Sequence, residues 1–353
     1  MPNRRRAVAA LTALAAAPLL PLPAEARAAE ARAAEARAAE ARAAGTGSSA
    51  GRSPEALSGS RTPAHARLVA ADRVSERVLD LTIDSPALGR EGHARVLLPT
   101  GYDRRPHRRW PVLYLLHGCC DPGPGWEAWT LNTDVEGITA DTPALIVSPE
   151  GGPVGFYSDW WNGGRYGPPA WETFHLAELR PLLERALRAN GRRAIAGLSM
   201  GGFGALSYAA RHPRLFRAAA SFSGVVHTTL DPAGVQGILT GGGADPTALW
   251  GDPAAQSPLW DAHNPYALIP RLPRGYPVYL SCGNGAPGPL DPPDRPEDTL
   301  ERGLGEMAGR YARRARGHGL AVTTRLYGPG THTWPYWERE LTRALPLLTA
   351  PLI

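Results

Sequence analysis

The chain has 353 residues and a formal net charge of +5, and its 38 basic side chains are all arginine. The absence of lysine excludes P-loop nucleotide-binding proteins, protein kinases and pyridoxal phosphate enzymes, because the chemistry of each needs a lysine. The length suits one large domain or two ordinary ones, and a hydrophobic content of 43% can fill a sizeable core.

The N-terminus has the features of an export signal. Arginines occupy positions 4–6, an apolar run follows over residues 7–22, and small residues suited to cleavage come next. This order predicts a signal peptide over residues 1–28 and a secreted protein, extracellular or associated with the cell wall. Without that segment the chain keeps 34 basic and 32 acidic residues. The basic excess therefore belongs largely to targeting, and we expect no nucleic-acid partner and no stable membrane insertion after signal cleavage.

Residues 29–67 are predicted to form a spacer. Four copies of Ala-Glu-Ala-Arg-Ala fill residues 24–43, and a period of five gives a helix no single apolar face. Residues 45–64 are rich in Gly, Ser, Pro and Thr, which is typical of flexible linkers. The folded domain is therefore expected over residues 68–353.

Within that domain, short apolar strands come first in succession and then in alternation with helices. The predicted strands are Arg77–Ile83, Ala94–Leu98, Val112–Leu116, Leu145–Ser148, Arg193–Ala196, Ala218–Phe222, Val278–Ser281 and Val322–Tyr327. The predicted helices are Trp171–Ala189, Met200–Arg211, Pro296–Arg316 and Pro335–Leu347. This order predicts an α/β fold with a mostly parallel central sheet, an antiparallel edge and flanking helices. Residues 225–273 are rich in Gly and Pro without a clean period, so we expect a cap-like insertion there.

The segment Gly197–Gly201 reads Gly-Leu-Ser-Met-Gly and is the only Gly-x-Ser-x-Gly motif within the predicted folded domain. It follows one predicted strand and opens a predicted helix, which is the strand–turn–helix context that this motif requires. A side chain two positions before or after the serine would clash with neighbouring backbone, which explains both glycines. The motif predicts Ser199 as a catalytic nucleophile.

A serine nucleophile needs a basic histidine, and the histidine needs an orienting carboxylate. The histidines that follow Ser199 at a useful distance are His227, His263, His318 and His332. His332 lies in a loop between the last predicted strand and the final helix, where sheets of this kind place their chemistry, so we predict it as the base. The carboxylate is expected between the predicted strand Val278–Ser281 and His332. Spacing alone does not choose among the acids there, which are Asp291, Asp294, Glu297, Asp298 and Glu301.

Several segments together carry a resemblance to a known family. They are Val112–Gly118, Phe156–Trp160, Trp171–Phe174, Gly197–Gly202, Ile269–Leu272, Cys282–Gly285 and Gly330–Trp337. In this order, and over residues 75–348, the chain resembles the antigen 85 mycolyltransferases, secreted actinobacterial enzymes of the esterase D-like group. The resemblance implies the α/β-hydrolase fold.

The resemblance also implies roles for individual residues. In that family a Pro-x-x-x-Leu-Glu segment supplies the acid, which here is Glu301, with Asp291 as the fallback. The matched donors of the oxyanion hole are the backbone N–H groups of Cys119 and Met200. The family's sugar-binding Asp and Arg are replaced by His117 and Cys120, which argues against transfer of mycolate to trehalose.

Substrate contacts are expected from Trp334, His117 and Trp160, although orienting the oxyanion loop is the simpler role for His117. Trp residues at 126, 129 and 161 could also line the cleft, or belong to the core. A disulfide from Cys119 or Cys120 to Cys282 stays open. The spacing of Cys and His fits no zinc site, and we expect no metal and no cofactor.

These features predict a secreted serine esterase or acyltransferase that acts on an acyl ester through an acyl-enzyme intermediate. A lipid ester and a sugar ester are both candidate substrates. One alternative is a carbohydrate esterase of the feruloyl or acetyl type. The other is a non-catalytic secreted adhesion protein on the same fold, against which the retention of Ser199, Glu301 and His332 argues.

Overall fold

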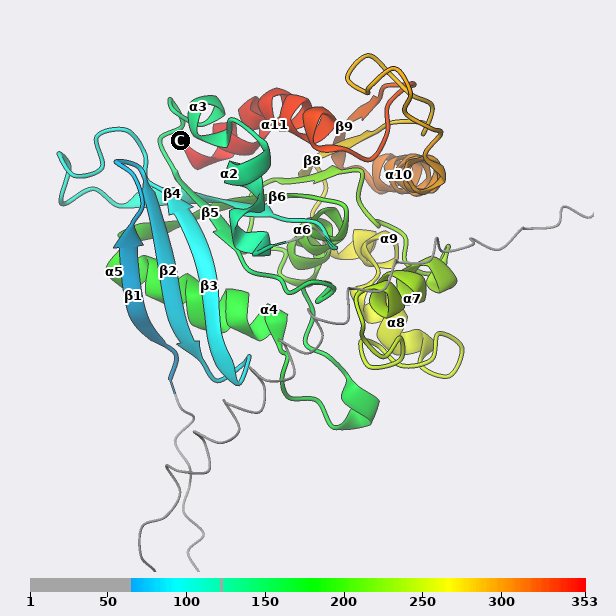
Figure 1. Ribbon diagram of the computed structural model, residues 1–353, viewed down its shortest axis with the longest axis horizontal. Helices are drawn as coiled ribbons and strands as arrows, with labels where there is room; N and C mark the ends of the chain where they lie inside the picture. Colours follow the sequence, from blue (N-terminus) through cyan, green and yellow to red (C-terminus); the bar gives the residue numbers. More distant parts are fainter. Residues whose placement is uncertain (1–64, 121–122) are drawn as a thin grey trace, which may run out of the picture. The chain divides into compact units, whose positions relative to one another are not determined.

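The computed structural model describes residues 65–120 and 123–353, which Figure 1 draws in colour. The predicted signal peptide over residues 1–28, the repeat, and the linker up to residue 64 lie outside the described residues. The predicted start of the folded domain at Leu68 falls inside the first strand, which begins at Arg67. In the part of the chain that the structure describes, no helix is long and apolar enough to cross a membrane.

The described residues form one sheet of nine strands in the order β1-β2-β3-β5-β4-β6-β7-β8-β9. The strands are β1 (Arg67–Arg73), β2 (Val78–Ser85), β3 (Arg90–Leu97), β4 (Trp110–Leu116), β5 (Leu145–Pro149), β6 (Ala189–Leu198), β7 (Ala219–Phe222), β8 (Pro277–Cys282) and β9 (Ala321–Leu326). Pairing is antiparallel from β1 to β5 and parallel from there to β9. The predicted fold, a mostly parallel sheet with an antiparallel edge, is confirmed. Strand β1 escaped prediction because it is an edge strand with little buried surface.

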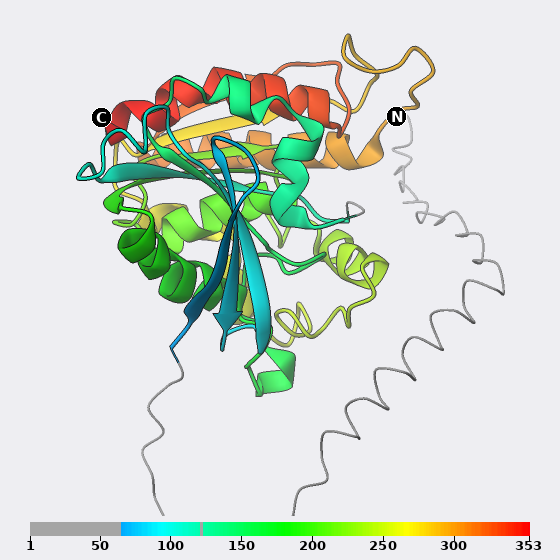
Figure 2. The ribbon, with the colours of Figure 1, turned by 60° about the vertical axis from the view of Figure 1, so that its left-hand side comes forward.

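Helices cover both faces of this sheet. They are α2 (Ala128–Asn132), α3 (Val135–Ile138), α4 (Trp171–Thr173), α5 (Arg180–Ala186), α6 (Met200–Arg211), α7 (Pro232–Gly241), α8 (Ser257–His263), α9 (Pro265–Leu268), α10 (Thr299–His318) and α11 (Trp334–Thr349). Figure 2 shows the red helix α11 on one side of the sheet and the green helices α5 and α6 on the other. The predicted helix Trp171–Ala189 is in fact α4, a π-helical segment (Phe174–Leu179) and α5, and its last residue already belongs to β6.

The central strands are apolar along their whole length because each face of the sheet has its own core. In β4, Val112, Tyr114 and Leu116 belong to the core under α5, α6 and α10. Leu113 and Leu115 belong to the core under α11. A strand buried on both faces has no polar side, which explains the continuous apolar runs of the sequence.

The region over residues 225–273 contains α7, α8, α9 and a 3-10 turn at Ile269–Arg271. Its apolar side chains join the core of the domain, since Trp250 packs edge-on against Phe156 with ring centroids 5.7 Å apart. Helix α7 contributes Ile238 to the pocket described below. The insertion is therefore packed onto the sheet domain, and one of its helices borders the candidate site.

Candidate active site

Ser199 occupies a strained turn between β6 and α6. Its backbone has φ of +52° and ψ of −119°, a left-handed region that non-glycine residues enter at a cost. The predicted reason for the flanking glycines is confirmed. A Cβ on Gly197 would lie 2.3 Å from the carbonyl oxygen of Gly201, and one on Gly201 would lie 2.4 Å from that of Leu116. The Ser199 N–H donates to the carbonyl oxygen of Phe222 at 2.9 Å, which ties the turn to β7.

Glu301 lies in the first turn of α10 with its side chain fully buried. Its Oε1 accepts hydrogen bonds from the Gly283 N–H at 2.6 Å and the Ser223 hydroxyl at 2.8 Å, and the Cys282 thiol lies 3.1 Å away. Its Oε2 lies 2.7 Å from Nδ1 of His332. Burial alone would raise the pKa of Glu301, but the hydrogen bond and charge of His332, followed by the other donors, outweigh it and lower the pKa. Glu301 is therefore an ionised carboxylate held by neutral donors on the side away from His332.

His332 is bound to Glu301 through one ring nitrogen only. Because an ionised carboxylate only accepts hydrogen bonds, Nδ1 must carry the proton, which leaves Nε2 able to accept one. The imidazole packs edge-on against Trp337, with ring centroids 4.8 Å apart, and its backbone N–H donates to Oδ2 of Asp298 at 2.9 Å. The geometry is that of a base oriented by an acid.

Ser199 and His332 line the same pocket of about 440 Å³, called the Ser199 pocket from here on. Its lining residues are Gly118, Cys119, Cys120, Leu198, Ser199, Val225, Ile238, Arg295, Leu300, His332, Thr333, Trp334 and Trp337. Most of this lining is apolar, which suits an acyl chain. Of the predicted substrate contacts, Trp334 lines the pocket, where it packs edge-on against both Trp129 and Trp337.

Of the two predicted oxyanion residues, one lines this pocket and the other follows Ser199 directly in the chain. Cys119 lines the pocket, and a Cβ placed on the preceding Gly118 would lie 3.4 Å from Cβ of Ser199. Met200 is the first residue of α6, a helix whose N-terminus favours negative charge. Cys119 and Met200 therefore both belong to segments next to Ser199, and the binding of an oxyanion by their backbone N–H groups stays a prediction.

The structure does not bring His117 or Trp160 to the lining of the Ser199 pocket. His117 is buried, its Nδ1 donates to the carbonyl oxygen of Gly118 at 2.6 Å, and its Nε2 accepts from the Gly151 N–H at 2.8 Å. Burial lowers the pKa of His117 to about 4, so the ring is neutral. Trp160 donates from Nε1 to the carbonyl oxygen of Gly155 and packs against the core. These contacts favour the loop-orienting role for His117.

The remaining histidine and acid candidates have other partners. His227 stacks on Tyr266, His263 is buried beside Ser158, and His318 ends α10 with Nε2 3.3 Å from the carbonyl oxygen of Leu272. Glu297 forms an ion pair with Arg302, and Asp294 is exposed. Asp291 accepts hydrogen bonds from Thr331, Tyr336 and the Gly288 N–H. None of these reaches the His332 ring in the described part of the chain.

Sequence reasoning missed the side chains that hold the acid in place. Ser223 follows β7 directly and has a positive φ of +48°, unusual for a serine. Its hydroxyl donates to Glu301 and accepts from Nε1 of Trp337 at 3.2 Å. A serine after a buried strand at the carboxyl edge of the sheet was the available signal. Cys282 is buried as a free thiol beside Glu301, so the disulfide to Cys119 or Cys120 that the sequence left open is not formed in the structure.

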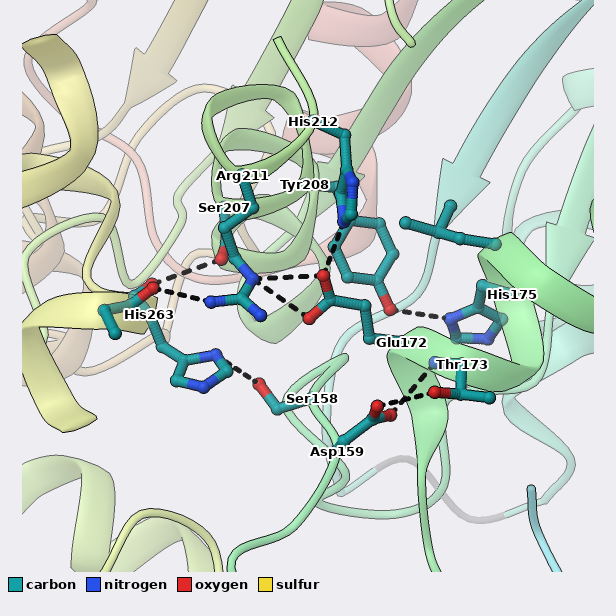
Figure 3. A network of polar contacts seen from close by, with 12 residues as sticks. Ser158, Asp159, Glu172, Thr173, His175, Ser207, Tyr208, Arg211, His212 and His263 are labelled. Carbon is teal, nitrogen blue, oxygen red and sulfur yellow. Dashed lines mark hydrogen bonds and ion pairs between the residues drawn. The ribbon is translucent and has the colours of Figure 1, made fainter. Parts of the chain in front are cut away.

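A second glutamate–histidine cluster lies at the other end of α6 (Figure 3). Glu172 accepts from Nε of Arg211 with both oxygens at 3.0 Å, and its Oε1 lies 2.6 Å from Nε2 of His212. Arg211 also donates to the carbonyl oxygen of Ala262 at 2.7 Å. We call Glu172, Arg211 and His212 the Glu172 cluster. It borders a cavity of about 870 Å³ whose lining contains no Ser or Cys among the described residues, so the larger cavity offers no such nucleophile.

Among the described residues no group of three or more His, Cys, Asp and Glu side chains is placed to hold a metal ion.

The chain is similar in sequence and in fold to several known proteins. The Esterase family model matches residues 85–348. An esterase of Mycobacterium tuberculosis (strain H37Rv) is 35% identical over 234 residues, which are 64% of this chain and 50% of that protein. This chain therefore spans about half the length of that relative.

Another relative matches over most of both chains. The diacylglycerol acyltransferase/mycolyltransferase Ag85B of Mycolicibacterium smegmatis is 32% identical over 280 residues, which are 75% of this chain and 82% of that protein. Among solved structures, MPT51 of Mycobacterium tuberculosis matches with a TM-score of 0.63 and 24% identity, over 76% of this chain and 96% of that chain. The structural match supports the fold.

Proposed function

Because this chain belongs to the Esterase family, we propose that it is a secreted serine esterase or acyltransferase that works through Ser199, His332 and Glu301. The sequence and structure matches confirm two expectations from the sequence, the resemblance to the antigen 85 enzymes and the α/β-hydrolase fold. One observation carries the proposed mechanism: an imidazole oriented by a buried carboxylate lines the same pocket as a serine on a strained turn.

In the proposed reaction Oγ of Ser199 attacks the carbonyl carbon of the ester, and Nε2 of His332 takes its proton. Glu301 stabilises the imidazolium that forms. The negative charge that develops on the carbonyl oxygen faces the backbone N–H groups of Cys119 and Met200. When the intermediate collapses, the C–O bond to the alcohol breaks and His332 passes its proton to the leaving oxygen. Water or a second alcohol then releases the acyl group by the reverse sequence.

The lining of the Ser199 pocket supports an ester with an apolar acyl group. Leu198, Val225, Ile238 and Leu300 supply apolar wall, and Trp334 adds an aromatic surface. His117 replaces a family carboxylate that holds the sugar, and both of its nitrogens are bound to backbone. Loss of that sugar contact favours water, or an acceptor other than trehalose, in the second half of the reaction.

The test is labelling with a fluorophosphonate, which reacts with an activated serine. The wild-type enzyme should be labelled, Ser199→Ala should not, and His332→Ala should be labelled far more slowly. Hydrolysis of aryl esters of increasing chain length, with and without sugar or glycerol acceptors, then separates hydrolysis from transfer. Absence of labelling in the wild type would favour the adhesion alternative, and labelling that survives Ser199→Ala would move the nucleophile elsewhere.

Export is part of the proposal and rests on residues 1–28. Expression with and without these residues, followed by measurement of the esterase in medium and cells, tests it. Equal retention of both forms in the cells would contradict secretion.

A further inference from the structure

Asp298 touches the backbone of both the acid and the base of the proposed triad. Its Oδ1 accepts from the Glu301 N–H at 3.0 Å, which makes it the N-cap of α10. Its Oδ2 accepts from the His332 N–H at 2.9 Å. One carboxylate thus connects two segments that are 31 residues apart, at the two residues whose side chains must meet.

Asp298 is itself firmly held. Its backbone N–H donates to the carbonyl oxygen of Gly285 at 2.7 Å. A Cβ on Gly285 would lie 2.1 Å from the carbonyl oxygen of Asp298, and Gly285 has a φ of +83°, so only glycine suits this close approach. The loop after β8 therefore fixes the position from which Asp298 reaches His332.

The loop that carries His332 needs such support. It contains two glycines, Gly328, with a φ of +76°, and Gly330. Glycine leaves the backbone free to adopt many conformations unless other contacts fix it. Its backbone is tied to the loop after β8, because the Gly330 N–H donates to the carbonyl oxygen of Ala286 at 2.7 Å. Asp291 binds the hydroxyl groups of Thr331 and Tyr336 on either side of His332. Asp298 adds the contact at His332 itself.

Both oxygens of Asp298 accept from backbone N–H groups, and neither contacts the imidazole ring. The nearest cation, Arg295, lies 3.7 Å from Oδ2, which is longer than a hydrogen bond. The two acids nearby in the sequence, Glu301 and Asp291, are bound by donors of their own. Asp298 is therefore bound to the backbone of Glu301 and His332 and not to the side chains that would react.

We propose that Asp298 is a positioning residue that locks His332 onto the start of α10 and thereby sets the Glu301–His332 pair for catalysis. This inference rests on the proposed function, since it assigns His332 as the base. Small displacements of a catalytic group cost about 100-fold in rate, so the contact has a large expected effect although it is remote from the substrate.

The decisive variant is Asp298→Ser. Serine is a good N-cap and keeps the bond to the Glu301 N–H, but its single short hydroxyl cannot also reach the His332 N–H. We expect kcat/KM for aryl esters to fall about 10- to 100-fold, with most of the loss in kcat and KM within about twofold of wild type. The thermal midpoint should stay close to that of the wild type because the cap remains.

The matched control is Asp134→Ser. Asp134 caps the short helix α3 by accepting from the Gly137 N–H at 3.1 Å and does not line the Ser199 pocket. Its kcat/KM should equal that of the wild type. Should Asp298→Ser fail to fold, Asp298→Asn takes its place, since Asn caps helices well and can accept from only one of the two N–H groups.

A second readout is independent of catalysis. Amide hydrogen exchange at His332 should be faster in Asp298→Ser than in wild type, while exchange in the interior of α10 stays unchanged. If the wild type hydrolyses no ester, the proposed function fails, and exchange at His332 still decides whether Asp298 locks the loop. Full kcat/KM in Asp298→Ser, or unchanged exchange at His332, would overturn the positioning role while leaving the esterase proposal intact.

Discussion

Two glutamate–histidine pairs lie near opposite ends of α6, and only one of them suits catalysis. Behind the Ser199 pocket, the buried Glu301 meets His332 at 2.7 Å, and its other oxygen binds uncharged donors. In the Glu172 cluster the carboxylate meets His212 at 2.6 Å, but both of its oxygens also bind Arg211. The distances are nearly equal, so the surroundings distinguish the two pairs.

The arginine is the main electrostatic difference. Arg211 neutralises Glu172, so that carboxylate has little charge left to stabilise an imidazolium on His212. Glu301 keeps its charge, because a backbone N–H and a serine hydroxyl satisfy its hydrogen bonds without cancelling its charge. The second difference is the nucleophile, since Ser199 shares a pocket with His332. These two differences make the Glu301–His332 pair, and not the Glu172–His212 pair, the candidate for catalysis.

The largest expected contrast is between the two histidines. His332→Ala should lower kcat for ester hydrolysis by about 10⁴-fold or more, because the serine loses its base. His212→Ala should leave kcat within about twofold of wild type. Steady-state hydrolysis of an aryl ester measures both. A comparable loss of kcat in His212→Ala would break the distinction between the two clusters.

The two glutamates should separate activity from stability. Glu301→Gln should lower kcat by about 10³- to 10⁴-fold, because a neutral amide does not stabilise the imidazolium. Glu172→Gln should leave kcat nearly unchanged and lower the free energy of unfolding by about 2 kcal/mol, because Arg211 and His212 lose a charged acceptor. Kinetics and urea unfolding of both variants provide the check. The comparison fails if Glu172→Gln loses activity without losing stability.

Ser223→Ala should have an intermediate effect. It removes the hydroxyl that donates to Glu301 and accepts from Trp337. We expect kcat to fall about tenfold, which corresponds to the loss of one hydrogen bond of about 1.4 kcal/mol to a charged group. Ser207, whose hydroxyl donates to the carbonyl oxygen of His263 near the Glu172 cluster, offers the control. Ser207→Ala should keep wild-type kcat, and equal losses in both variants would indicate a general packing effect.

The smallest expected effect is on the pH dependence of stability. Burial would raise the pKa of Glu172, but His212 and Arg211 outweigh it and lower the pKa below its ordinary value of 4.5. The unfolded chain therefore binds more protons than the folded one just below pH 4.5, so stability rises with pH there. The contribution of Glu172 is complete above its unfolded pKa and is lost as the pH falls through its lower folded pKa.

Glu172→Gln should reduce the change of unfolding free energy with pH in this acid range, as measured by urea unfolding between neutral pH and about pH 3. Glu301→Gln should reduce it too, because the pKa of Glu301 is also lowered. If neither substitution changes how the unfolding free energy depends on pH in the acid range, other carboxylates dominate acid unfolding.

Much of the sheet was predictable because its strands are short apolar runs between turns. Eight strands and the helices α6, α10 and α11 lie where the sequence predicted them, within a few residues. The Trp171–Ala189 prediction went past the true end of α5, because Ala, Leu and Arg near Ala189 favour helix while pairing of Trp110 with Ala189 makes that residue a strand. Contact with a neighbouring strand overrode local preference.

Some residues of the candidate site were likewise predictable from local sequence, and others were not. Ser199 followed from local sequence, because the close approaches at Gly197 and Gly201 and the strand–turn–helix context leave a signature within a few residues. Glu301 could be selected only by resemblance to a family, since five acids shared the right stretch of sequence. In the structure it is the one whose carboxylate reaches the His332 ring.

The sequence by itself thus determined the α/β class, the candidate nucleophile and the candidate base, because each rests on residues close together in the chain. Tertiary structure decided the partner of the base, the loop-orienting contacts of His117 and the double contact of Asp298. It also decided that His212, despite its glutamate, lies beside an arginine. These contacts form between loops that follow separate strands. The residues are far apart in the sequence, so no short-range pattern predicts them.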